Sequence, residues 1–174
     1  MEPFGAINLV IAIFCPIKLS RSLLLQIIFS GFLENKVAGK AYKLMYQSQQ
    51  WTRAKEECES LGASLAVPKS QEEFQFLQKL VRGMCYPQIT GTRYKLLVWL
   101  GINNLESFPV WKNVDGNLTT FLCLTIWGSY SADPKEPHCV GMDAINPGLR
   151  DYWCHLRQPY IFVKNFHLII IIDT

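Results

Sequence analysis

"VWLGINNLESFPVWKNVDG", residues 98–116, contains two tryptophans twelve positions apart, and each is followed by a glycine that interrupts a strand-like pattern. Tryptophan usually belongs to a core or an interface. Gly101 inside the first apolar run indicates a bulge or a close backbone approach, and Asp115-Gly116 indicates a turn. The stretch therefore predicts two short strands of one sheet, joined by a loop.

Two amphipathic helices are predicted upstream of this stretch. Residues 48–62 place apolar side chains at helical spacing and stop at a glycine; these side chains are Trp51, Ala54, Cys58 and Leu61. Residues 70–83 open with Ser70 and Glu73, which form an S-x-x-E capping box. Each pattern is long and periodic enough to predict a helix.

Strand-like segments lie on both sides of a long irregular stretch. The stretch covers residues 113–138 and is rich in Gly, Ser, Asp and Pro. The predicted strands, besides those of the opening segment, are residues 41–47, 63–68, 139–143, 151–156 and 160–163. Strands and helices that alternate and are then followed by several strands indicate an α+β fold. A loop of this size in a compact domain is usually functional.

Composition and charge exclude several classes of protein. The chain has 174 residues, 49% of them hydrophobic and 18% charged, which indicates one folded domain rather than a disordered chain. The net charge is +3, and no basic stripe interleaved with aromatics occurs, so no nucleic-acid partner is expected. No nucleophile, zinc-protease or phosphate-loop motif is present, so the chain is not expected to be an enzyme.

Residues 1–40 are predicted to be an apolar leader followed by a polar linker at 34–40. The apolar arms, residues 7–17 and 23–33, are each shorter than the roughly 20 residues that span a bilayer. A single span would bury Lys18 and Arg21, so a membrane span is not expected. A signal peptide fits better, which predicts a secreted or extracellular protein; the alternative is a leader that is not processed. Residues 167–174 form a short apolar tail.

The cysteines and one sequon also bear on whether the chain is secreted. None of the six cysteines forms a C-x-x-C pair, which argues against zinc, and an even number suits disulfides. A site made of His138-Cys139 and Cys154-His155 is also disfavoured, because adjacent residues on a strand point to opposite faces. Asn117 begins an N-x-T sequon, which predicts glycosylation if the chain is secreted.

Several of these segments resemble landmarks of the C-type lectin-like domain family. Residues 49–78 are similar to its first two helices, "VWLGINNLE" to its Trp-Ile-Gly-Leu strand, and "VWKNVDG" to its Trp-x-x-x-Asp-Gly; Trp127 resembles a later tryptophan. The resemblance covers residues 41–164 and predicts a domain at 41–166, with two helices flanking antiparallel sheets. It implies that Trp99 and Trp111 anchor the core and that Cys139 and Cys154 form the family's inner disulfide.

The resemblance also implies where a ligand binds, and it argues against calcium. The family's long loop and the neighbouring strands bind sugars through calcium in many members, and proteins or lipids without it in others. The ligand-binding candidates here are Tyr130, Asp133, Glu136, Arg150 and Asp151. Arg150 replaces an amide ligand of the calcium-binding members, and a guanidinium has no lone pair to offer. We therefore expect no metal or other cofactor, and we expect Arg150 to pair with Asp151, and with Glu136 or Asp133, in place of the ion.

The outer disulfide of the family lacks one partner, because Phe162 occupies the position of the second cysteine. Cys58 is then a buried free thiol, or it pairs with Cys85 or Cys123. Without a bridge that closes about a hundred residues, the domain loses roughly 4 to 5 kcal/mol of stability in the chain-entropy model.

Two functions follow from these observations. The first is a recognition module that binds carbohydrate or protein ligands without calcium. The alternative is a degenerate family member that is poorly stable and has little or no ligand binding.

Overall fold

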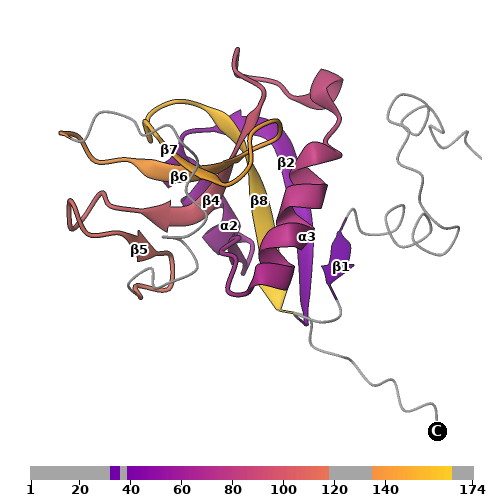
Figure 1. The fold of residues 1–174 in the computed structure, drawn as a ribbon, viewed down its shortest axis with the longest axis horizontal. Helices are drawn as coiled ribbons and strands as arrows, with labels where there is room; N and C mark the ends of the chain where they lie inside the picture. Colours follow the sequence, from indigo (N-terminus) through magenta and orange to yellow (C-terminus); the bar gives the residue numbers. More distant parts are fainter. Residues whose placement is uncertain (1–31, 36–38, 118–134, 166–174) are drawn as a thin grey trace, which may run out of the picture.

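The computed structural model describes residues 32–35, 39–117 and 135–165, and Figure 1 shows their arrangement. In chain order the elements are β1 (Leu33–Asn35), β2 (Lys40–Gln49), α2 (Trp51–Ser60), β3 (Ser64–Leu65), α3 (Gln71–Arg82), a 3-10 turn (Tyr86–Gln88), β4 (Leu97–Asn103), β5 (Lys112–Asn113), β6 (Cys139–Asp143), β7 (Leu149–Tyr152) and β8 (Gln158–Asn165). Two helices and a multi-stranded sheet confirm the α+β prediction.

The described strands form one sheet in the order β1-β2-β8-β4-β6-β7, while β3 pairs with β8 and β5 with β4. All of these pairs are antiparallel except β4 with β8, which run parallel at Trp99 and Tyr160. The expected antiparallel sheets are therefore corrected to one mixed sheet. The last strand returns to the centre of the sheet, so the two ends of the domain, β2 and β8, are neighbours.

The opening stretch forms β4 and β5, which pair in antiparallel fashion as predicted. Gly101 marks a close approach: a Cβ atom there would lie 2.8 Å from the Leu65 carbonyl oxygen and 2.9 Å from Val67 Cγ2. Gly116 has a positive φ of 81°, as the Asp-Gly turn requires. Trp99 is fully buried, whereas Trp111 is only partly buried at the margin of the core. The core-anchor interpretation therefore holds fully for Trp99 and in part for Trp111.

Both predicted helices are present and bury the expected faces. The buried side chains are Trp51, Ala54 and Cys58 on α2, and Glu73, Phe74, Leu77 and Val81 on α3. Ser70 caps α3 by accepting a hydrogen bond from the Glu73 amide at 3.1 Å. Leu61 departs from the prediction: α2 ends at Ser60, so the Leu61 side chain lies outside the stripe and is 52% exposed.

Two boundaries differ from the sequence prediction. Part of the expected 34–40 linker is a strand: β1 pairs with β2 from Leu33 opposite Tyr42 to Asn35 opposite Lys40. The strand expected at residues 151–156 instead spans Leu149–Tyr152 and is followed by a turn. Cys123, Trp127, Tyr130 and Asp133 lie outside the described residues. Among the residues that are described, no helix is long and apolar enough to cross a membrane.

Candidate ligand-binding site

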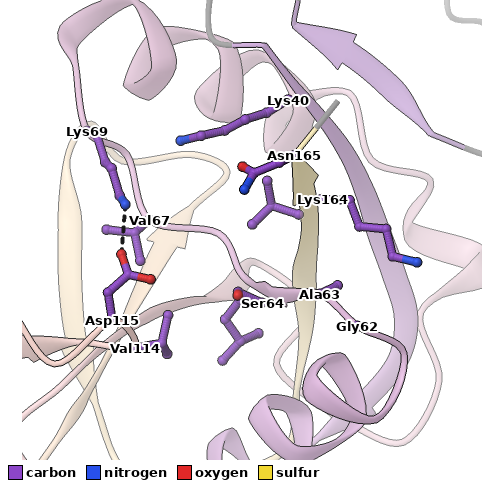
Figure 2. Close-up of a pocket in the computed structure, with 12 residues that line it drawn as sticks. Lys40, Gly62, Ala63, Ser64, Val67, Lys69, Val114, Asp115, Lys164 and Asn165 are labelled. Atoms are coloured by element: carbon purple, nitrogen blue, oxygen red, sulfur yellow. Dashed lines mark hydrogen bonds and ion pairs between the residues drawn. The ribbon is translucent and has the colours of Figure 1, made fainter. Parts of the chain in front are cut away.

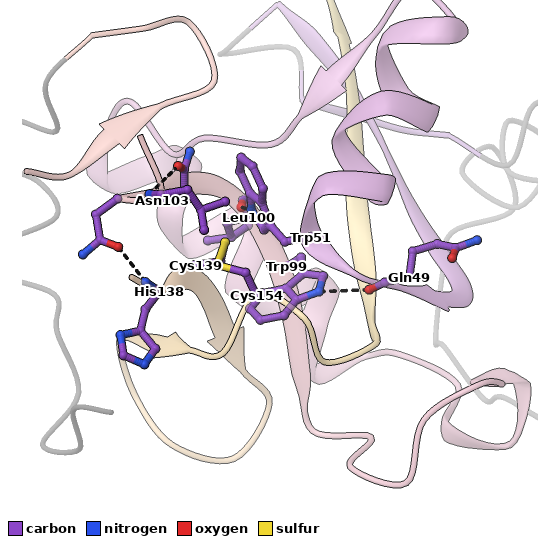
Figure 3. The surroundings of a disulfide bond; sticks show 10 residues. Gln49, Trp51, Trp99, Leu100, Asn103, His138, Cys139 and Cys154 are labelled. Carbon is purple, nitrogen blue, oxygen red and sulfur yellow. Dashed lines mark hydrogen bonds between the residues drawn. A yellow bond between two sulfur atoms is a disulfide. The ribbon is translucent and has the colours of Figure 1, made fainter. Parts of the chain in front are cut away.

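A disulfide joins the start of β6 to the turn after β7. Cys139 and Cys154 are bonded, with Cα atoms 5.1 Å apart, within the range expected of a bridge. The Cys154 carbonyl also accepts the Trp51 amide at 3.0 Å, which ties this turn to the start of α2. Figure 3 shows the bridge beside Trp51 and Trp99. The β6–β7 hairpin is thereby held against the core at the end where the long loop returns.

The indole groups around the bridge have hydrogen-bond partners that sequence analysis did not identify. Trp99 Nε1 donates to the Gln49 carbonyl at 3.1 Å, and Trp51 Nε1 donates to the Leu100 carbonyl at 2.7 Å. Buried indole N–H groups usually need such an acceptor. These bonds link β2, α2 and β4 and orient both rings beside the disulfide.

His138 marks the return of the long loop to the sheet. Its backbone amide donates to Asn104 Oδ1 at 2.6 Å, and its carbonyl accepts the Asn104 amide at 3.1 Å. The imidazole is buried and packs edge-on against Trp153, with ring centroids 5.9 Å apart. His155 is exposed, and no group of three metal-ligating side chains occurs within the described residues. Asn104 was not among the predicted site residues, because only tertiary structure brings it to His138.

Arg150 forms an ion pair, but with a different partner from the one predicted. Its Nε lies 3.4 Å from Oδ2 of Asp143, whose side chain is fully buried. Arg150 lies opposite Gly141 in the sheet, and Asp143 is two residues further along the same face of β6. Asp151 is the next residue on β7, so its side chain points to the other face. The ion pair that Arg150 forms within the described residues is thus with Asp143, and its expected pairing with Asp151 and with Glu136 or Asp133 stays a prediction.

Asp143 is the acidic centre of this site, and the sequence did not indicate it. Oδ1 accepts the amides of Ile145 and Asn146 at 2.7 and 3.0 Å, and Oδ2 accepts the Tyr94 hydroxyl at 3.3 Å. Burial alone would raise the pKa of this carboxyl. The hydrogen bonds from Asn146 and Ile145 and the charge of Arg150 outweigh burial, so the pKa lies below its ordinary value. Asp143 is thus a carboxylate at neutral pH.

Aromatic rings continue the site along the hairpin. Tyr94 stacks on Tyr152 with centroids 6.0 Å apart, and Tyr152 contacts Trp153 edge-on at 5.3 Å. Tyr94 is 36% exposed, while Tyr152 and Trp153 are partly buried. We call Tyr94, Arg150, Tyr152 and Trp153 the hairpin face. It offers ring faces, phenol hydroxyls and a guanidinium, which are groups suited to binding polar ligands with an apolar side.

The other predicted residues are dispersed. Glu136 is exposed, and Asp151 is 7% exposed on β7 opposite Val140. Asn117 is exposed at the point where the chain leaves β5 for the long loop. Tyr130 and Asp133 lie outside the described residues. Of the five ligand-binding candidates, Arg150 is therefore the one that the described structure brings into the hairpin face.

Comparison with known proteins assigns the chain to a family. The family model "Lectin C-type domain" matches residues 47–162, and the chain belongs to that family. A 122-residue segment is 28% identical to the C-type mannose receptor 2 of Mus musculus; it covers 69% of this chain and only 8% of that receptor.

Solved structures share the fold. The mouse scavenger receptor C-type lectin carbohydrate-recognition domain superposes with a TM-score of 0.62 at 21% identity, covering 79% of this chain and 96% of that one. The Ca²⁺-independent C-type lectin SPL-2 from Saxidomus purpuratus gives 0.62 at 23% identity, covering 78% and 92%. The fold is therefore that of a C-type lectin-like domain.

Proposed function

We propose that this domain is a non-enzymatic recognition module that binds carbohydrate or protein ligands without calcium. Membership of a lectin family supports ligand recognition. The observation that carries calcium independence is the ion pair between Arg150 and Asp143. The family resemblance implies that Arg150 stands where calcium-binding members have an amide ligand, and its ion pair with a buried carboxylate supports the proposal.

Charge is the physical basis of the proposal. Calcium requires six to eight oxygen ligands, supplied by carboxylates, amides and carbonyls. Arg150 contributes no lone pair and adds a fixed positive charge, which repels a divalent cation. Asp143 is already occupied by Arg150, two backbone amides and a tyrosine hydroxyl. The protein thus carries its own cation next to the hairpin face.

The hairpin face supplies contacts for the ligand itself. Tyr94 and Tyr152 present stacked rings, and Trp153 adds a third ring at the disulfide turn. Ring faces bind the apolar side of a sugar or of a protein side chain, while hydroxyl and guanidinium groups set its orientation. This arrangement favours the recognition module over the degenerate alternative, because the rings and the buried charge are all packed or paired.

Calcium and chelator test the proposal directly. The full chain is melted, and its binding to an array of immobilised neutral glycans is measured, in calcium and in excess chelator. We expect the same melting temperature and the same binding in both. Calcium at a hundred times its Kd would add about 2.7 kcal/mol, which is several degrees in a domain of this size. Such a shift, or binding that disappears with chelator, would contradict calcium independence.

Secretion and glycosylation are separate parts of the proposal. We infer that the chain enters the secretory pathway and carries a glycan on Asn117, whose exposed position is accessible to the transferring enzyme. Expression in mammalian cells should give secreted protein whose mass falls after treatment with N-glycosidase. Thr119→Ala removes the sequon and is the matched control. Retention of the wild-type chain inside the cells would contradict this part and would favour the degenerate alternative.

A further inference from the structure

A cavity lies apart from the hairpin face, at the C-terminal end of β8. Its volume is about 280 Å³, and none of its lining residues belongs to β6 or β7. Two strand pairs form its sides: Ser64 lies opposite Val163, and Lys40 lies opposite Asn165. The turn after β5 closes it with Asp115. Figure 2 shows these segments around the opening.

One side of the cavity is apolar. Val67, Val114 and Val163 line it, and Leu65 is buried beneath them. Ligand sites in proteins are concave, with an apolar lining and a few polar groups, and commonly measure about 300–1,000 Å³. This cavity is close to the lower end of that range. It therefore suits a ligand of one ring better than an extended chain.

Two of the three lysines that line the cavity form ion pairs. Lys69 Nζ lies 2.7 Å from Asp115 Oδ2, and Lys40 Nζ lies 2.7 Å from Oε1 of the buried Glu73. The Lys164 ammonium sits 5.7 Å from the centroid of the Phe162 ring, and in Figure 2 it points away from Lys40 and Lys69. An ionic ligand that binds between Lys40 and Lys69 would have to displace one partner of an existing pair. An uncharged ligand would not.

Donors and acceptors stand side by side at this opening. Asp115 is an acceptor, Lys69 is a donor, and the Ser64 hydroxyl and the Asn165 amide can each do both. A sugar hydroxyl also both donates and accepts, so neighbouring hydroxyls can bridge a carboxylate and an ammonium group without separating them. The C–H face of a sugar ring matches the three valines. We propose that this cavity, here called the β8 pocket, binds one unit of a neutral saccharide.

The test uses the full chain and three defined probes. Methyl α-mannopyranoside, methyl β-galactopyranoside and N-acetylglucosamine are titrated to millimolar concentration, and the amide signals of Ser64, Asp115 and Asn165 are followed by two-dimensional NMR. We expect at least one probe to shift these signals saturably. Asp115→Asn and Lys69→Gln should each weaken that binding about tenfold, because each removes a hydrogen bond to a charged group.

The controls separate the pocket from general charge effects and from the hairpin face. Lys79→Gln removes the same charge from an exposed position on α3 and should leave binding unchanged. Arg150→Gln should also leave it unchanged, so the β8 pocket and the proposed function can fail independently. No shift with any of the three probes, or unchanged affinity in Asp115→Asn and Lys69→Gln, overturns the proposal. Stronger binding of glucose 6-sulfate by Asp115→Asn, without binding of the neutral probes, would make this an anion site and would also overturn it.

Discussion

Phe162 shows how a single residue changes the stabilisation of this domain. The family resemblance places it where other members have the second cysteine of the outer disulfide, and it is 4% exposed in the same core cluster as Cys58. The Phe32 ring packs edge-on against it, with centroids 5.6 Å apart. Among the described cysteines, Cys58 and Cys85 are free thiols, which excludes the Cys58–Cys85 pairing. We therefore expect burial of this aromatic side chain to offset part of the stability that the covalent link would give.

Restoring the second cysteine tests whether the buried Phe162 ring takes the place of the outer disulfide. In Phe162→Cys under reducing conditions, we expect the free energy of unfolding to lie about 3 to 5 kcal/mol below that of the parent under the same conditions, since a buried aromatic ring is lost. Oxidation should form a bond with Cys58 and return about 4 to 5 kcal/mol more than it returns to the parent, because the closed loop holds about a hundred residues. The oxidised variant should then be about as stable as the parent. Urea unfolding and thiol titration measure the two effects.

Phe162→Cys combined with Cys58→Ala is the matched control for that experiment. It loses the same ring but cannot form the new bond, so oxidant should change its stability only as much as it changes that of the parent, whose Cys139–Cys154 bond also re-forms. An oxidised single variant with one more titratable thiol than the parent, rather than one fewer, would show that Cys58 and residue 162 are not close enough to bond, contrary to the packing described here.

At the scale of elements, α3 is joined to β2 through Glu73. The Glu73 carboxylate is buried and accepts hydrogen bonds from Lys40 Nζ and the Tyr42 hydroxyl through Oε1, and from the Lys69 amide through Oε2 at 2.9 Å. The sequence predicted Glu73 as part of a capping box. The structure keeps the Ser70 half of that box but uses the Glu73 side chain to join the helix to the sheet.

Replacing this carboxylate should be costly. In Glu73→Gln, the buried carboxylate that pairs with the partly buried Lys40 ammonium is lost, and we expect the free energy of unfolding to fall by about 3 kcal/mol. Glu72→Gln is the matched control, because Glu72 lies in the same first turn but is exposed. Chemical denaturation of both variants gives the comparison. Equal, small losses would show that Glu73 acts only through the helix dipole.

For the whole molecule, three buried acidic groups predict how stability depends on pH. Burial raises the pKa of the Cys58 thiol from 9.0 to about 12, and it also raises the pKa values of Tyr42 and Tyr160. In the unfolded chain these groups ionise near their ordinary values, while in the folded domain they stay protonated. Their contribution to the free energy of unfolding is therefore complete below about pH 9 and is lost as the pH rises.

We expect the free energy of unfolding to fall above about pH 9, by up to about 1.4 kcal/mol per pH unit for each group. Urea unfolding followed by tryptophan fluorescence at about pH 7, 9 and 11 measures this slope. Cys58→Ala removes one of the three groups and should make the decline shallower. Stability that stays level over this range would mean that the groups ionise equally in both states.

The sequence by itself determined the features that depend on near neighbours. Helical spacing and the Ser70 cap predicted α2 and α3, because capping and amphipathic periodicity act within a few residues. Gly101 predicted the close approach of another backbone segment, because a glycine inside a strand-like pattern lacks the side chain that would keep that segment away. The landmark pattern of the family predicted the bond between Cys139 and Cys154, although their spacing alone left the pairing open.

Only the tertiary structure decided which distant groups meet. Tyr94 and Asp143 are 49 positions apart and Tyr42 and Glu73 are 31 apart, and each pair forms because separate strands or helices bring it together. The partner of Arg150 depends on strand register, since a shift of one residue moves a side chain to the opposite face. The parallel contact between β4 and β8 depends likewise on where the last strand inserts. Local sequence patterns carry no information about such register and insertion, because both are set by packing of the whole sheet.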